Sequence, residues 1–167
     1  MNLIIDGLEI SDLSALGIKQ TFASVNNGSL LRMADGTAVK QKVWGKLKTT
    51  ISAMGWIPDG LSGINFDNAV TVDCIAQRSI VSASNAIAIP GTVRPDVDPW
   101  GIALVNGQWQ DVGSSFASGT LTIDVTAGAT QYQARWMPRL TLYCNEPETE
   151  TDSAGNVFNW SITGEEV

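Results

Sequence analysis

The sequence contains no histidine, which restricts the acid–base chemistry open to it. Histidine is the commonest general base and the usual activator of serine and cysteine nucleophiles. Catalysis would have to rely on lysine or on paired carboxylates, and Asp96 with Asp98 or Asp111 with Asp124 could form such pairs. Their spacing does not distinguish them from solvated acids on loops and strand faces. We therefore predict no catalytic residues and a protein that is not an enzyme.

The segment 145–156 (NEPETETDSAGN) carries acidic side chains at alternating positions, and carboxylates are typical ligands of cations. It does not follow the twelve-residue calcium pattern D-x-[DN]-x-[DN]-G with a final glutamate. No glycine-rich segment leads from a strand into a helix, as a phosphate site of that kind requires. We interpret this segment as a flexible acidic turn and predict no metal and no cofactor.

Six tryptophans are the other residues that suggest a binding role. Exposed indole rings stack on sugars, but tryptophan also anchors protein interfaces. Trp136 and Trp160 occupy inward-facing positions of expected strands, so we assign them to the core. The remaining four are Trp44, Trp56, Trp100 and Trp109. For these, both a carbohydrate-binding surface and a subunit contact remain open.

Most of the lysines lie between Leu30 and Ser52, in the segment LLRMADGTAVKQKVWGKLKTTIS. Asp35-Gly36 predicts a two-residue type I′ turn, because both central residues of that turn need positive φ. A hairpin with a long second strand over 39–51 should result. Apolar residues recur there every four positions, which fits a helix face as well as a strand face. Gly45 disfavours a helix, and the Val, Thr and Ile residues favour a strand.

Alternation along this strand places its four lysines on one face, with Trp44 among them. This face is the candidate subunit interface, and its residues are Lys40, Lys42, Trp44, Lys46 and Lys48. Thirteen extended residues span about 40 Å, so the hairpin must bend or project from its domain. A projecting arm is suited to pairing with another subunit. The alternative is an outer face whose lysines protect a strand edge against aggregation.

Charge is distributed unevenly along the chain. The net charge is -7, yet Leu31 to Ser52 carries one arginine and four lysines against one aspartate, or +4, which leaves -11 for the rest. Complementary patches on one chain permit head-to-tail contacts between identical copies. A mixed surface kept for solubility would have the same totals. The negative net charge argues against a general nucleic-acid binder.

The sequence shows no segment for insertion into a membrane and no signal peptide. No stretch approaches the length of a membrane span. The start, MNLIIDGLEI, lacks the charged beginning and the long apolar region of a secretion signal. These features predict a protein that begins at Met1 and folds in a cytoplasm. Cys74 and Cys144 are expected as buried thiols, and a disulfide between them stays open.

Short strands and tight turns dominate the rest of the sequence. Asn106-Gly107 between two apolar runs predicts a hairpin, and Asp6-Gly7 predicts a shorter one. Asn26-Asn27-Gly28 is expected to turn the chain into the long hairpin. The segment 120–126 should point Leu121, Ile123 and Val125 inward. A second long strand is expected over 131–144, with Pro138 at an edge or bulge.

No sustained helix pattern follows residue 20, so the predicted class is all-β: an antiparallel sandwich or split β-barrel with long hairpin arms and little helix. We expect one structural domain over 1–167. Pro90-Gly91, Pro95 and Pro99 mark a loop near 90–100. A subdivision into 1–92 and 101–167 would fall there.

Four segments together resemble small tail-tip proteins of long-tailed bacteriophages, of the distal tail or minor tail type. They are LRMADGTAVKQKVWGKLKTTISAMGWIPDGL, VDCIAQRSI, YQARWMPRLTLYCN and FNWSITGEEV. The resemblance implies a β-rich structural subunit of the virion that forms a ring, a hexamer or trimer, between the tail tube and the tip or baseplate. It also implies a barrel or split sandwich whose long hairpin contacts neighbours, a role that Leu30 to Ser52 would fill.

The partners implied are other copies of the chain, the tail tube and other tail-tip or baseplate proteins. Assembly would take place in the cytoplasm of the host bacterium. Two other functions stay open. The chain could be a tail tube or tail terminator subunit, or it could be a carbohydrate-binding or receptor-binding β module, which only the tryptophan content favours.

Overall fold

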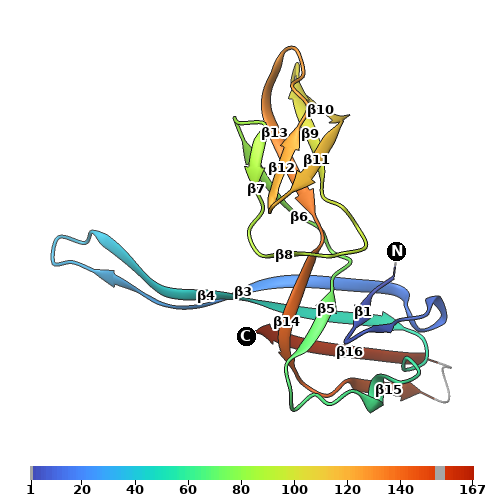
Figure 1. The fold of residues 1–167 in the computed structure, drawn as a ribbon. Helices are drawn as coiled ribbons and strands as arrows, with labels where there is room; N and C mark the ends of the chain where they lie inside the picture. Colours follow the sequence, from blue (N-terminus) through green and yellow to red (C-terminus); the bar gives the residue numbers. More distant parts are fainter. Residues whose placement is uncertain (1, 153–156) are drawn as a thin grey trace. The chain divides into compact units, whose positions relative to one another are not determined.

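A computed structural model of the chain describes residues 2–152 and 157–167 (Figure 1). In this part the chain forms β-strands and two short 3₁₀ helices, Asp12–Ser14 and Leu61–Gly63. The pairings are antiparallel, and the sheets of the described residues remain open. The predicted all-β class with little helix is therefore confirmed.

The chain divides into two compact units. Unit 1 comprises residues 72–140, and unit 2 comprises residues 2–71 and 141–167. The chain leaves unit 2 within β5 (Val70–Asp73) and returns within β14 (Pro138–Cys144). The loop 90–100, where the sequence suggests a subdivision, lies inside unit 1. Unit 1 is thus inserted into the chain of unit 2.

Unit 2 is organised around a sheet with the strand order β2-β1-β5-β14-β16-β4-β3, in which β15 also pairs with β16. Its other strands are β1 (Ile4–Ile5), β2 (Leu8–Glu9), β3 (Leu16–Arg32), β4 (Ala38–Met54), β15 (Glu148–Asp152) and β16 (Val157–Glu166). Alternate residues of β4 and β16 point into the core, where Ile51, Ala53, Trp160 and Ile162 are buried. Because Trp160 Nε1 donates to the carbonyl of Ser14 at 2.6 Å, this buried donor is satisfied.

The β3–β4 hairpin is longer than the sequence predicts, with seventeen residues in each strand. The predicted turn at Asn26-Asn27-Gly28 is wrong, because β3 runs straight through it. The carbonyl of Gln41 lies where a Cβ of Gly28 would be, so glycine serves a close backbone approach here and not a reversal.

The tip of this hairpin also differs from the prediction. Gly36 has a φ of 84°, but Asp35 is not among the described non-glycine residues with positive φ, so the turn is not type I′. The chain instead reverses through three residues between Met33 and Thr37, whose backbone groups are joined by a 2.9 Å hydrogen bond. At Asn106-Gly107 and Asp6-Gly7, by contrast, both residues have positive φ, as predicted.

Unit 1 is a small sandwich of two sheets, β10-β9-β13-β6 and β11-β12-β7. Its strands are β6 (Arg78–Ser82), β7 (Ala86–Ala88), β8 (Thr92–Val93), β9 (Trp100–Val105), β10 (Gln108–Val112), β11 (Ser114–Ala117), β12 (Thr120–Ile123) and β13 (Ala129–Trp136). The two sheets share one core, in which Leu121, Ile123 and Trp136 are at most 1% exposed. Val125 is 81% exposed, so its predicted inward position is wrong, because β12 ends at Ile123.

The second long strand is interrupted at Met137, where β13 ends and β14 begins. Its predicted inward residues are all buried, namely Tyr132, Ala134, Trp136, Pro138, Leu140, Leu142 and Cys144. Cys74 and Cys144 are buried free thiols, and burial raises the pKa of the Cys144 thiol to about 11. The buried-thiol prediction is confirmed, and the pairing left open by the sequence is absent from the structure.

Replacing Gly164 by alanine should destabilise unit 2, because the added Cβ would lie 2.5 Å from Cys144 Sγ and 3.1 Å from Leu142 Cβ. We expect a loss of about 1–3 kcal/mol of unfolding free energy, as for other overpacked core positions. The matched control is Gly63→Ala, whose new Cβ would meet nothing within 4 Å. Urea unfolding followed by circular dichroism measures both variants. Equal midpoints for the two would contradict the close packing of β14 against β16.

Candidate interaction site on the long hairpin

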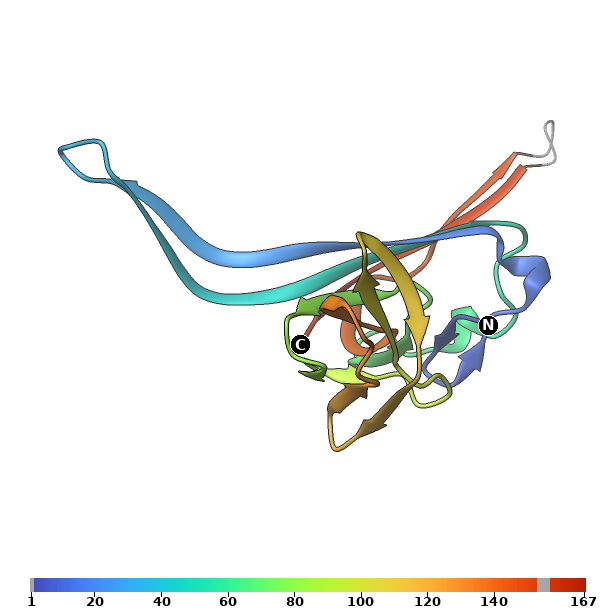
Figure 2. The same cartoon turned by 90° about the horizontal axis from the view of Figure 1, so that it is seen from above.

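The outer half of the β3–β4 hairpin, residues 26–46, extends beyond the other strands of unit 2, and we call it the arm (Figures 1 and 2). Strand β16 covers the edge of β4 only from Met54 to Lys48. Farther out, β4 pairs with β3 alone among the described strands. Every arm residue is exposed except Val39, which is half-buried. The arm therefore has no hydrophobic core of its own.

A β-bulge distributes the lysines of the hairpin over two faces. Asn27 pairs with Trp44 and Gly28 with Lys42, so Val43 has no partner on β3. One extra residue shifts the alternation of the side chains. Lys42 accordingly lies on the same face of the hairpin as Gly45: its Nζ is 2.6 Å from the position that a Cβ of Gly45 would take. The prediction that the four lysines share one face is wrong, because alternation cannot reveal a bulge.

The two lysines nearest the core contact the acidic end of β16 in the same chain. Lys48 Nζ lies 3.2 Å from Glu165 Oε1, and Lys46 Nζ donates to the carbonyl oxygen of Val167. Between them, the backbone N–H of Leu47 donates to Glu166 Oε2 at 3.0 Å. The positive and negative stretches of the sequence thus meet partly within one chain. Lys40 and Lys42, farther out, make no such contact with a described residue.

The arm also exposes large apolar side chains. They are Leu30, Leu31, Met33, Val43 and Trp44, each 44–77% exposed. At the tip, the backbone N–H of Thr37 donates to Asp35 Oδ1 at 2.9 Å, and this bond lowers the pKa of the Asp35 carboxyl. Apolar groups gathered on a projecting element are typical of protein interaction surfaces. Residues 26–44 reach beyond Lys46 and its contact with Val167, and we call them the free part of the arm. Of the predicted interface residues, Lys40, Lys42 and Trp44 lie there.

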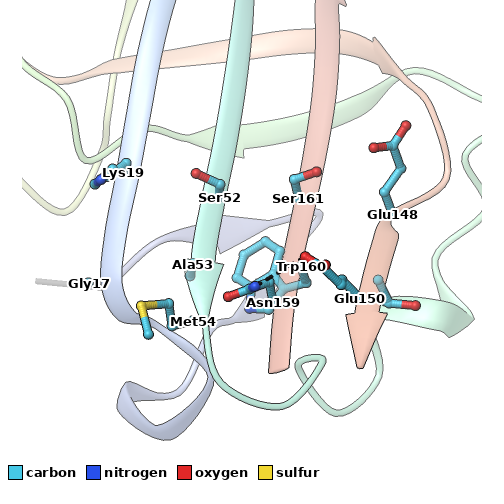
Figure 3. A pocket seen from close by; sticks show the side chains of 11 residues that line it. Gly17, Lys19, Ser52, Ala53, Met54, Glu148, Glu150, Asn159, Trp160 and Ser161 are labelled. Carbon is cyan, nitrogen blue, oxygen red and sulfur yellow. Dashed lines mark hydrogen bonds between the residues drawn. The ribbon is translucent and has the colours of Figure 1, made fainter. Parts of the chain in front are cut away.

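A trough of about 400 Å³ lies on the outer face of the unit 2 sheet, at the root of the hairpin (Figure 3). Its floor is a row of directly paired residues, in which Lys19 faces Ser52, Ser52 faces Ser161, and Ser161 faces Glu148. In the next row Met54 faces Asn159, which faces Glu150. The lining therefore has a basic wall on β3, an acidic wall on β15 and hydroxyl groups between them.

No sequence pattern predicts this trough, because its residues come from four strands, three of which are brought together by pairings over long sequence separations. One relevant prediction was also wrong. Residues 148–152, expected to be part of a flexible acidic turn, form strand β15 along β16. The rest of that predicted turn includes residues 153–156, which lie outside the described residues.

Of the carboxylates considered for catalysis, Asp96 belongs to a network of ion pairs. Both oxygens of Asp96 accept from Arg94, at 2.5 and 2.7 Å, which lowers the pKa of the Asp96 carboxyl. The Arg94 side chain is buried and also donates to the carbonyls of Asp73 and Cys74. Arg139 in turn holds both oxygens of Asp73. This network ties segments of unit 1 together and makes Asp96 the ion-pair partner of the buried Arg94.

The remaining candidate features are scattered. Trp136 and Trp160 are buried as predicted. Trp56 stacks on Phe158 with a centroid separation of 4.4 Å, whereas Trp100 and Trp109 lie in unit 1.

Within residues 2–152 and 157–167, no group of three or more acidic or cysteine side chains could hold a metal ion. No helix of these residues is long and apolar enough to cross a membrane.

Neutralising Lys46 and Lys48 together, as Lys46→Gln with Lys48→Gln, should lower the stability of unit 2. The expected loss is about 0.2–1 kcal/mol per contact, the usual range for exposed ion pairs, and it should shrink at high salt. The matched control is Lys40→Gln with Lys42→Gln, which removes the same charge where no described acid is paired with it. The urea midpoints of the two double variants, measured at low and high salt, give the stability loss of each. A larger effect of the outer pair would contradict the assigned contacts.

No protein-family model matches the chain, and no curated protein matches it either. Its function therefore has to be argued from the arm and the trough.

Proposed function

We propose that this chain is a non-enzymatic structural subunit that assembles with further copies of itself through the arm. The observation that carries the proposal is the arm itself, which extends past its own sheet and exposes Leu30, Leu31, Met33, Val43 and Trp44. A two-stranded hairpin without further packing is marginally stable in water. A second surface that covers these side chains would stabilise the arm by burying them.

The assembly that we propose is a ring in the tail tip or baseplate of a long-tailed bacteriophage, of the distal tail type. The resemblance of the four sequence segments supports this setting, and the arm supplies the contact element that such a ring needs. The ring would be a hexamer or trimer that links the tail tube to tip proteins, and it would form in the host cytoplasm before entering the virion. A tail tube or tail terminator subunit would use the arm in the same way.

Trp44→Ala should weaken self-association by about tenfold or more, because truncation of a buried interface tryptophan is among the costliest substitutions. The matched control is Trp109→Ala in unit 1, since Trp109 is 41% exposed and Trp44 is 44% exposed. Light scattering behind size exclusion, over a concentration series, gives the mass of each variant. If the wild-type chain stays monomeric throughout, or if both variants assemble alike, the arm is not a self-assembly element.

A carbohydrate-binding module is the second candidate, and one observation favours it. Trp109 pairs with Leu104, which lies four residues after Trp100 on β9, so both indoles occupy the same face of the β10-β9-β13-β6 sheet. We expect no glycan to bind this face. Binding on a glycan array that is lost in both Trp100→Ala and Trp109→Ala would favour the module instead.

A further inference from the structure

The acidic wall of the trough consists of Glu148 and Glu150, and neither carboxylate forms an ion pair with a described residue. Strand β15 carries Glu148, Glu150 and Asp152 and no basic residue. Glu150 accepts a hydrogen bond from Asn159 Nδ2 at 3.3 Å, but Glu148 has no hydrogen bond or ion pair with a described residue. Met54 lies in the same row as Glu150 but across Asn159, on β4, and is 58% exposed. The trough thus has two exposed carboxylates on its β15 side and an exposed apolar side chain on its β4 side (Figure 3).

The free part of the arm has the complementary composition. Residues 26–44 carry Arg32, Lys40 and Lys42 against Asp35, a net of +2. None of these three basic side chains is paired with an acid of the described chain, although Arg32 Nη1 donates to the carbonyl of Gly36. Exposed Leu30, Leu31 and Met33 lie among them in the sequence. The arm therefore offers basic and apolar groups together.

These two surfaces cannot meet within one chain. Lys40 and Ser52, on the floor of the trough, lie on the same strand twelve residues apart, which is about 40 Å in an extended chain. Strand β3 pairs with β4 along this whole distance and prevents the arm from folding back. Only Lys46 and Lys48 lie close enough to the acidic end of β16 to contact it. A partner for the outer basic groups must come from another molecule.

We propose that the trough receives the arm of a second copy of this chain, with the basic side chains of the arm beside Glu148 and Glu150 and its apolar side chains against Met54. The inference rests on the proposed self-assembly and names its acceptor surface. Lys19, on the opposite wall, repels basic groups and restricts them to the β15 side. The contact joins two different surfaces of identical chains, so it repeats from copy to copy and closes into a ring when the rotation permits.

The test is a charge exchange between the two surfaces. One variant carries Glu148→Lys with Glu150→Lys, and another carries Lys40→Glu with Lys42→Glu. Each alone should self-associate about tenfold or more weakly than the wild type, because like charges then oppose each other. An equimolar mixture of the two should associate again, because copies that alternate place each arm beside an oppositely charged trough. Alternating copies close an even-numbered ring such as a hexamer, whereas a trimer-forming chain would associate in the mixture without closing. The control, Asp59→Lys with Asp111→Lys, changes exposed acids outside the trough by the same charge and should assemble normally.

The outcomes separate this inference from the proposed function on which it rests. If the variant with Glu148→Lys and Glu150→Lys assembles like the wild type while the arm variant does not, the arm binds elsewhere and only the acceptor surface is wrong. If both variants fail and the mixture does not recover, the two surfaces do not meet. If the wild type does not associate at any concentration, self-assembly fails and this inference fails with it. Circular dichroism of each variant confirms that the fold is retained.

Discussion

The antiparallel pairing of β3 with β4 continues well past the point where the rest of the sheet supports it. Near the core, β4 is held on its other edge by β16, and Ile51 and Ala53 pack in one layer with Trp160 and Ile162. Beyond Lys48, β3 and β4 pair only with each other among the described strands. Backbone hydrogen bonds between β3 and β4 satisfy only the inner edge of each strand, and they contribute little net stability in water. The arm depends on its root for its geometry and on a partner for the burial of its side chains.

Because of this constraint, the four lysines of β4 form two groups with different surroundings. Lys46 and Lys48 are close enough to β16 to meet Val167 and Glu165, so their charges support the fold of their own chain. Lys40 and Lys42 are carried away from the acidic end of β16 by the same strand, and the bulge at Val43 moves them to the other face. The length of the hairpin thus keeps opposite charges of one chain apart and makes them available to neighbouring copies.

Local signals in the sequence predicted local features well. Positive φ at Asn106 and Gly107 follows from the short amide side chain of asparagine and from the absence of a Cβ in glycine, and the buried alternation from Tyr132 to Cys144 follows from the strand period. The failures involve contacts between distant residues. Nothing near Val43 indicates that β3 leaves it without a partner, and the glycine of Asn26-Asn27-Gly28 serves a contact with Gln41 instead of a turn. The trough combines residues from both ends of the sequence, so no local pattern could indicate it.

Amide hydrogen exchange at low and high protein concentration tests most directly whether the arm is an assembly element. Peptides that cover residues 26–46 should exchange quickly in dilute protein, because the arm frays without a partner, and they should become protected as the concentration rises. Peptides from unit 1 serve as the internal reference and should not change. If exchange in the arm is the same at every concentration at which the chain is seen to associate, assembly does not use the arm and the central claim is wrong.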